Sequence, residues 1–123
     1  YSIGEFSALT DIPAPTLRYY EQEQLLIVNR DVIGRRFYTP TDVTWILFIK
    51  KLKDTGMPIK EIREYALLRY QGDSTMQQRL ELLEKHKVTV VEKKTQWESN
   101  LLNLDEKISL YKSKLNKMNK KLL

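Results

Sequence analysis

The sequence has no cysteine and only one histidine among its 123 residues. Disulfides, thiolate metal sites and thiol redox switches are therefore excluded, and His86 alone cannot supply a zinc site made of nitrogen ligands. No acidic cluster has the spacing of a metal-binding loop either. We therefore expect no bound metal and no cofactor.

Long apolar runs are also missing. No run approaches the roughly twenty residues that a membrane-spanning helix needs. The first five residues, YSIGE, lack the basic and apolar regions of a signal peptide. These absences predict a soluble cytoplasmic protein with no membrane association.

The residue patterns of common active sites are absent as well. We find no carboxylate pair, no nucleophile beside a base and no glycine-rich phosphate loop, so an enzyme is the least favoured class. The apolar share of 41% and the charged share of 30% allow one globular domain, or a small domain with an extended element. The net charge of +5 lies mostly beyond residue 70 and indicates nucleic-acid binding only weakly.

Two short helices are expected at the start of the chain. The first covers residues 2–9, where Ser2 and Glu5 form a capping box. About four residues, 10–13, separate it from the second helix, and Asp11 is a residue type that tolerates a left-handed backbone. This spacing matches a helix-turn-helix.

The second helix contains the run TLRYYE at residues 16–21. Leu17 and Tyr20 are three residues apart and can share a buried face, which leaves Arg18 and Tyr19 pointing outward. A guanidinium beside a phenol suits phosphate oxygens, so we interpret Arg18 and Tyr19 as DNA contacts. Solvated helix surface is the alternative.

The first residues of this helix, Ala14, Pro15 and Thr16, are expected to enter the major groove. Their side chains are short and offer few donors, so direct base readout is expected to be modest and DNA shape to supply much of the specificity.

Lys60 is a further candidate DNA contact, because it lies in the first turn of a later helix where free amides could hold a phosphate. A solvated lysine is nearly as good an interpretation.

A short hairpin, or wing, is predicted over residues 24–38, where apolar and polar residues alternate around residues 29–31 and Gly34 provides a second turn. It supplies four candidate phosphate contacts: Arg30, Arg35, Arg36 and Tyr38. The alternative is a charged hairpin edge that resists aggregation, with Arg36 bracing the wing.

Alanine at Arg18 or Tyr38 is expected to weaken operator binding with little change in melting temperature.

Two longer helices are expected to follow. Thr39 is the predicted N-cap of the first, with Pro40 and Asp42 in its first turn and Gly56 at its end. Its expected buried residues are Val43, Ile46, Leu47, Phe48 and Leu52. The next helix covers residues 58–70, with Ile59, Ile62, Tyr65 and Ala66 on one side, and Gly72 breaks it. Ser74 and Gln77 are expected to cap the helix that comes next.

The last part of the chain has a heptad pattern. Apolar residues recur at alternating steps of three and four, interrupted only by Lys87 and Lys94, which predicts one long helix and a coiled coil. The expected dimerisation residues are Leu80, Leu83, Val90, Trp97, Leu101, Leu104, Ile108, Tyr111 and Leu115; we call this row, which continues to Leu122, the seam. A parallel dimer would place Lys87 and Lys94 against their own mates, which disfavours that arrangement. The domains are therefore predicted as residues 1–72 and 73–123.

The sequence resembles the MerR family of bacterial transcription regulators over roughly its first seventy residues. The matching positions are residues 3–5, 16–21 and 25–26, Arg30, Gly34, Arg36, Tyr38, Asp42, Gly56 and Ile62. The resemblance implies a mainly α fold, with a winged helix-turn-helix and an antiparallel coiled coil. It also implies a homodimer that binds operator DNA and, in many members of the family, activates transcription by distorting a promoter whose spacer is too long for RNA polymerase.

Some positions depart from the family pattern. Asp11 and Gln24 stand where glycines are usual. Residues 45–61 look like the small aldehyde- or electrophile-responsive branch, whose cysteine is replaced here by Lys51, so sensing through a thiol or a metal is excluded. A ligand pocket could be lined by aromatic residues, although core packing is the stronger interpretation: Trp45, Tyr65, Tyr70, Trp97 and Tyr111.

A second class of function stays open. The chain could be a coiled-coil interaction protein whose basic head binds another protein. Strong salt dependence and a preference for operator DNA would favour the regulator, because phosphate contacts release counterions. The operator, the regulated genes, the effector and the choice between activation and repression do not follow from the sequence.

Overall fold

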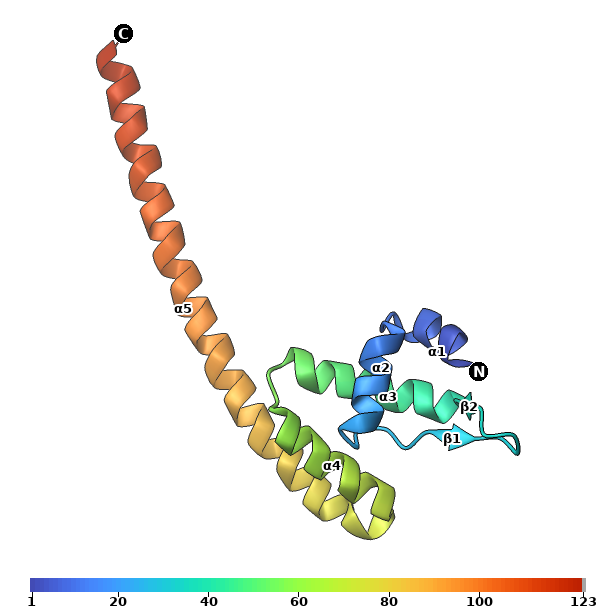
Figure 1. Cartoon of the computed structure of the whole chain (residues 1–123). Helices are drawn as coiled ribbons and strands as arrows, with labels where there is room; N and C mark the ends of the chain where they lie inside the picture. The colour runs from blue at the N-terminus through green and yellow to red at the C-terminus, as the bar shows by residue number, and fades with distance from the viewer. Residues whose placement is uncertain (123) are drawn as a thin grey trace. The chain divides into compact units, whose positions relative to one another are not determined.

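The computed structural model describes residues 1–122, which are mainly helical (Figure 1). The elements are α1 (Ile3–Thr10), α2 (Ala14–Gln22), β1 (Asn29–Arg30), β2 (Arg36–Phe37), α3 (Pro40–Asp54), α4 (Ile59–Gln71), the 3-10 helix η1 (Asp73–Thr75) and α5 (Met76–Leu122). The predicted order of helices and hairpin is therefore confirmed. Within the described range, no helix combines the length and apolar composition needed to cross a membrane.

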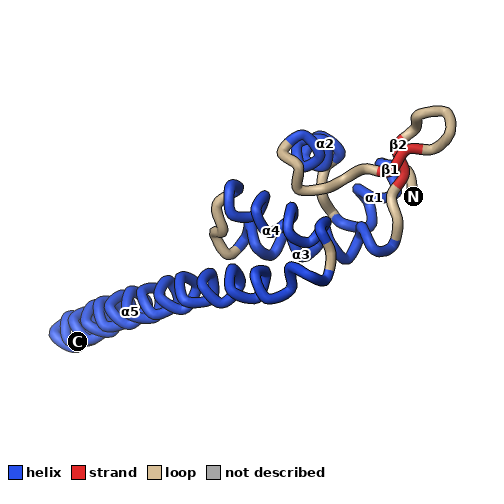
Figure 2. The backbone as a smooth tube through the Cα atoms, turned by 90° about the horizontal axis from the view of Figure 1, so that it is seen from below, coloured by secondary structure: helices blue, strands red, loops and turns tan. Residues whose placement is uncertain are grey.

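The chain divides into two compact units, Tyr1–His86 and the part of α5 that starts at Lys87. The first turns of α5 belong to the N-terminal unit, where Leu82 and Leu83 pack against its core. Within this unit, α2 and the hairpin lie on one side of α3 and α4, and the first turns of α5 lie on the other (Figure 2). The functional boundary expected after residue 72 stays a prediction.

Local capping fixes the starts of two helices as predicted. The Ser2 hydroxyl accepts a hydrogen bond from the Glu5 amide at 3.1 Å, and the Glu5 carboxylate accepts one from the Ser2 amide at 3.2 Å. These bonds from Ser2 hold the pKa of Glu5 below its ordinary value. The same reciprocal pair joins Thr39 and Asp42 at the start of α3.

Two residues without the freedom of glycine adopt a left-handed backbone. Asp11 has φ 55° after α1, and Gln24 has φ 64° at the entry to the wing. Both conformations favour glycine, since a Cβ crowds the backbone there. Asp11 and Gln24, which stand where the family usually has glycine, thus adopt the left-handed conformation that favours glycine.

The core lies where α1, α2, α3 and α4 meet. α3 buries Trp45, Ile46, Ile49 and Leu52, whereas Leu47 is 36% exposed. The prediction that Leu47 is buried was therefore wrong, and Trp45 and Ile49 were missed. Residues 45–49 read WILFI, so spacing alone does not say which side faces inward. The structure settles the matter partly through Trp45, whose indole N–H donates to the Leu25 carbonyl at 2.9 Å.

The connection between α4 and α5 also differs from the prediction. Ser74 does not cap α5; residues 73–75 form η1 instead, and α5 begins at Met76. The buried Thr75 hydroxyl donates to the carbonyls of Leu68 at 2.6 Å and Gly72 at 2.8 Å, which holds this turn against the end of α4.

Candidate nucleic-acid interface

Helix α2 presents the outward face that the sequence predicted. Leu17 and Tyr20 are buried, while Arg18 and Tyr19 are exposed. At its start, Pro15 is exposed and Ala14 and Thr16 are half-buried. Pro15 has no N–H, and the N-cap residue Pro13 makes no side-chain cap bond, so the Ala14 and Thr16 amides at the start of α2 have no capping side chain. The free amides and the exposed Arg18 can donate hydrogen bonds to phosphate oxygens from the same helix.

The wing is a two-stranded antiparallel hairpin in which Asn29 pairs with Phe37 and Arg30 with Arg36. Asn29 and Arg30 therefore lie in a strand, and the prediction that they form a turn was wrong. Asp31 makes the turn instead: its carboxylate accepts hydrogen bonds from the amides of Ile33 at 3.0 Å and Arg35 at 2.9 Å. An aspartate that bonds its own downstream backbone competes with strand pairing, and this closes the loop after Arg30.

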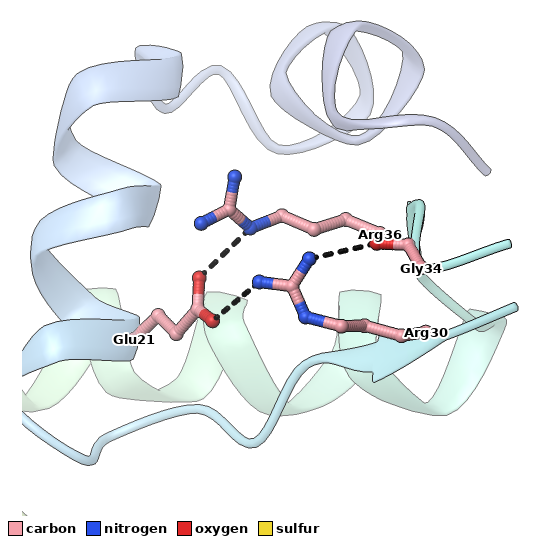
Figure 3. Close-up of polar contacts among 4 residues, drawn as sticks. All are labelled: Glu21, Arg30, Gly34 and Arg36. Atoms are coloured by element: carbon pink, nitrogen blue, oxygen red, sulfur yellow. Dashed lines mark hydrogen bonds and ion pairs between the residues drawn. The ribbon is translucent and has the colours of Figure 1, made fainter.

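Glu21 joins α2, the predicted recognition helix, to the wing (Figure 3). Its carboxylate accepts from Arg36 Nε at 3.0 Å and lies 3.7 Å from Arg30 Nη2. Arg30 also donates to the Gly34 carbonyl at 2.9 Å. These partly exposed pairs add little stability. Their main effect is to hold both arginines beside α2, so α2 and the wing, the two elements predicted to contact DNA, are joined.

Tyr38 lies deeper than the sequence indicated. Its ring is 2% exposed and stacks on Phe6 with ring centroids 4.2 Å apart. Burial raises the pKa of its hydroxyl, and Glu21 adds to the rise, whereas the nearby charges of Arg36, Arg18 and Arg30 oppose it. The hydroxyl is therefore held in its protonated form, in which it can donate a hydrogen bond. The expectation that alanine at Tyr38 leaves the melting temperature unchanged was wrong, because the ring is part of the core.

We expect Tyr38→Ala to destabilise the protein by about 3–5 kcal/mol, the usual cost of removing a buried aromatic ring. Tyr38→Phe keeps the ring and removes only the hydroxyl, so it should leave the melting temperature within a few degrees while weakening DNA binding several-fold. Thermal denaturation and fluorescence anisotropy on the same preparations separate the two effects. Equal DNA affinities for Tyr38→Phe and the unchanged protein would show that the hydroxyl makes no contact.

Arg35 and Lys60 are exposed. Arg35 lies 3.6 Å from the Asp31 carboxylate, and its side chain is 76% exposed, so its guanidinium can still reach a phosphate. Lys60 lies in the first turn of α4, whose N-cap residue Pro58 makes no side-chain cap bond. Lys60 also lines a hollow with Gln24 at the entry to the wing. The structure thus places this lysine near the wing entry, which lies two residues beyond the end of α2.

One long-range contact beside the candidate interface was missed from the sequence. Arg63 of α4 donates to the carbonyl of Glu23 at 3.0 Å and pairs with its carboxylate. Because Glu23 follows α2 directly, this contact ties the end of the recognition helix to α4. Forty residues separate the two side chains, and local spacing contains no sign of such a pair.

The sequence matches two protein-family models that describe this architecture. The model of the MerR HTH family regulatory protein matches residues 1–68, and the model described as MerR, DNA binding matches residues 43–107. The chain belongs to the MerR family. This MerR chain is a DNA-binding transcription regulator and not an enzyme.

Individual relatives agree with the family models. The chain is 36% identical to the HTH-type transcriptional regulator YyaN of Bacillus subtilis over 92% of its own length and 91% of that protein. It is similar to the crystal structure of a MerR family transcriptional regulator from Listeria monocytogenes, with a TM-score of 0.92, 30% identity and coverage of 99% and 93% of the two chains.

A third similarity bears on the interface itself. The crystal structure of HiNmlR, a MerR family regulator lacking the sensor domain, was determined bound to promoter DNA. This MerR chain matches it with a TM-score of 0.82 and 33% identity, over 92% of this chain and 90% of HiNmlR. The N-terminal unit therefore has the fold of a protein whose DNA complex is known.

Proposed function

We propose that this regulator binds promoter DNA as a homodimer and changes transcription by distorting the DNA for RNA polymerase. The observation that carries the DNA-binding mode is the Glu21 contact with Arg30 and Arg36, which joins the wing to α2 in one basic surface. Arg18 is exposed on α2, and its charge acts on the Tyr38 hydroxyl as do those of Arg30 and Arg36. Ala14, Pro15 and Thr16 would then lie in the major groove, and Tyr19, Arg35 and Lys60 would contact the backbone.

The exposed seam of α5 supports the homodimer. Among the described residues, its apolar side chains lie largely in solvent: Leu80 is 47% exposed, Trp97 73%, Leu101 58%, Leu104 57%, Ile108 42%, Tyr111 54% and Leu115 57%. A row of this length requires a partner helix. Leu83 instead packs against the core of its own unit and Val90 is half-buried, so the part of the seam beyond Val90 has the most apolar surface to offer.

We infer an antiparallel arrangement of the two seams, because a parallel one would place Lys87 and Lys94 against their own mates. The antiparallel arrangement would hold one unit at each end of the coiled coil, and a two-fold axis would present two recognition helices to symmetric half-sites. The short side chains at the start of α2 offer few base contacts, which agrees with specificity that depends on deforming the DNA. We expect the protein to act in the cytoplasm, where promoter DNA and polymerase are found.

Binding to the DNA upstream of its own gene tests this proposal. Fluorescence anisotropy at two salt concentrations, with unrelated DNA as competitor, should show tight binding that survives competition and weakens steeply with salt. Sedimentation should give the mass of a dimer. Only weak, competitor-sensitive binding, together with salt-insensitive capture of a protein partner, would favour the coiled-coil interaction protein instead.

A further inference from the structure

A hollow of about 340 Å³ lies among α3, α4 and the first turns of α5. Three aromatic rings line it. Trp45 and Tyr65 stack with centroids 5.8 Å apart and an interplanar angle of 13°, and Phe48 lies 6.5 Å from Trp45 and 5.7 Å from Tyr65. Trp45 and Tyr65 are two of the five aromatic residues that the sequence suggested for a ligand pocket. Trp45 and Tyr65 are buried and Phe48 is half-buried, so these rings make one side of the hollow apolar; we call this side the ring wall.

Two arginines line the same hollow. The Arg69 guanidinium lies 4.2 Å from the centroid of the Trp45 ring and 5.0 Å from that of Tyr70. Arg79 donates to the Gly72 carbonyl at 3.4 Å, while its Nε atom is buried without a hydrogen-bond partner. Leaving a buried donor unpaired is unfavourable, so a ligand that reorients and satisfies this guanidinium would be stabilised.

Neither of these two arginines has an acidic partner in the described structure. The chain has seven arginines, and four of them pair with an acid in the described structure: Arg30, Arg35, Arg36 and Arg63. Arg18 belongs to the DNA-facing surface. Arg69 and Arg79 are the two that remain, and neither meets a carboxylate within residues 1–122. Two like charges beside one hollow create a potential that favours an anion.

We propose that this hollow binds a small organic anion, namely an aromatic carboxylate of one or two rings. A guanidinium matches a carboxylate in two parallel hydrogen bonds, and an aromatic body can pack against the ring wall at the half-buried Phe48. The hydroxyls of Thr41 and Thr44 are further partners at the rim. The volume lies at the lower end of small-molecule sites, roughly 300–1,000 Å³.

The hollow is separate from the DNA-facing surface. Its lining includes α5, whose first turns lie across α3 and α4 from α2 and the hairpin (Figure 2). A bound anion would contact α3, α4 and the start of α5, the helix that carries the seam. An effector role for the ligand would rest on the proposed function, whereas binding itself requires neither DNA nor a dimer, so the test below uses the full chain without DNA.

The two tryptophans provide the measurement. Trp45 lines the hollow and Trp97 lies on the distal part of α5, so ¹H–¹⁵N NMR gives one indole signal at the site and one internal reference. Trp97→Phe assigns them. Titration with benzoate or 1-naphthoate is expected to shift the Trp45 signal to saturation and to leave Trp97 unchanged. Benzamide and inorganic phosphate, which lack the charge and the ring respectively, should bind at least tenfold more weakly.

Two variants test the assignment of charge. Arg79→Gln and Thr41→Asp should each weaken carboxylate binding at least tenfold. Thr41 is exposed in the first turn of α3, where an acid is well tolerated, so Thr41→Asp keeps the fold while placing a competing carboxylate at the rim. Lys85→Gln removes one exposed charge from α5 outside the hollow and should change nothing.

Several results would overturn the proposal. The first is the absence of a saturable Trp45 shift with either carboxylate. Equal binding of benzamide would exclude the role of the arginines, and equal binding of phosphate would exclude the ring wall. Unchanged carboxylate affinity in Thr41→Asp, with the Trp45 signal still shifting, would place the ligand elsewhere. Failure of operator binding leaves all these readouts intact, so the two proposals fail independently.

Discussion

Replacing Leu101 and Leu104 together with aspartate is expected to convert the dimer into a monomer and to abolish tight operator binding. Both side chains are more than half exposed on α5 and lie in the middle of the seam. Burial of a leucine contributes about 1.5–3 kcal/mol, so a dimer that loses four of them loses roughly 6 kcal/mol or more, about a 10⁴-fold change in dissociation constant. Opposing carboxylates would weaken it further.

The DNA-binding unit itself should survive this change. Its core involves none of the substituted residues, and the N-terminal unit ends at His86. The monomer should still bind a single half-site weakly, while affinity for the two-half-site operator falls by roughly 10²–10⁴-fold because the second contact is no longer intramolecular. Sedimentation gives the mass, and anisotropy with one or two half-sites gives the affinities.

Ser99→Glu is the matched control, because it adds a charge to the same stretch of α5 outside the seam. It should remain dimeric and bind the operator normally. If the Leu101 and Leu104 variant stayed dimeric, the seam would not be the dimer interface. If it became monomeric with unchanged operator affinity, dimerisation would not be needed for DNA binding.

Features that depend on neighbouring residues were predictable from the sequence. The capping pairs Ser2 with Glu5 and Thr39 with Asp42 each act over three residues, and both were predicted correctly. The long helix α5 was also predictable, since its heptad pattern runs without proline or glycine and ends in the described structure at Leu122. The signals here are local or periodic, so they survive in a single sequence.

The mistakes concern choices that only tertiary packing makes. Tyr38 follows two arginines and looked like a surface residue, but its ring is held by Phe6, 32 positions earlier. The continuous apolar run in α3 hid which side faces the core. Arg63 contacts Glu23 across forty residues, and no spacing rule connects them. Long-range pairs of this kind explain why individual site residues were harder to predict than the fold.

The hairpin shows a third kind of limit. The sequence allowed a turn either at residues 29–31 or at Gly34. The alternation of apolar and polar side chains fitted the strand register that each of these turns would give. The carboxylate of Asp31 decides the matter, because it accepts two amides within the loop. The resulting register places Arg30 opposite Arg36, and this is what allows both to reach Glu21.

Arg18→Ala is expected to weaken operator binding by about 10- to 100-fold with an unchanged melting temperature. Within residues 1–122 its side chain makes no hydrogen bond or ion pair, so its loss costs the fold nothing. A charge-assisted hydrogen bond to phosphate contributes roughly 1.5–3 kcal/mol, which corresponds to this range. Removing one contact per protomer should also lower the salt dependence by about two phosphates.

Two further variants show whether the effect comes from the guanidinium itself. Arg18→Lys keeps the charge but loses the fork, so its affinity should be intermediate and its salt dependence unchanged. Lys51→Ala removes an exposed charge from α3 and should bind DNA normally. Equal losses for Arg18→Ala and Lys51→Ala would mean that only overall charge matters. The other outcome is a loss of affinity only in the Arg18 variants, with Arg18→Lys intermediate between the unchanged protein and Arg18→Ala. That result requires a phosphate bound by the outward face of α2, the helix that Glu21 joins to the wing.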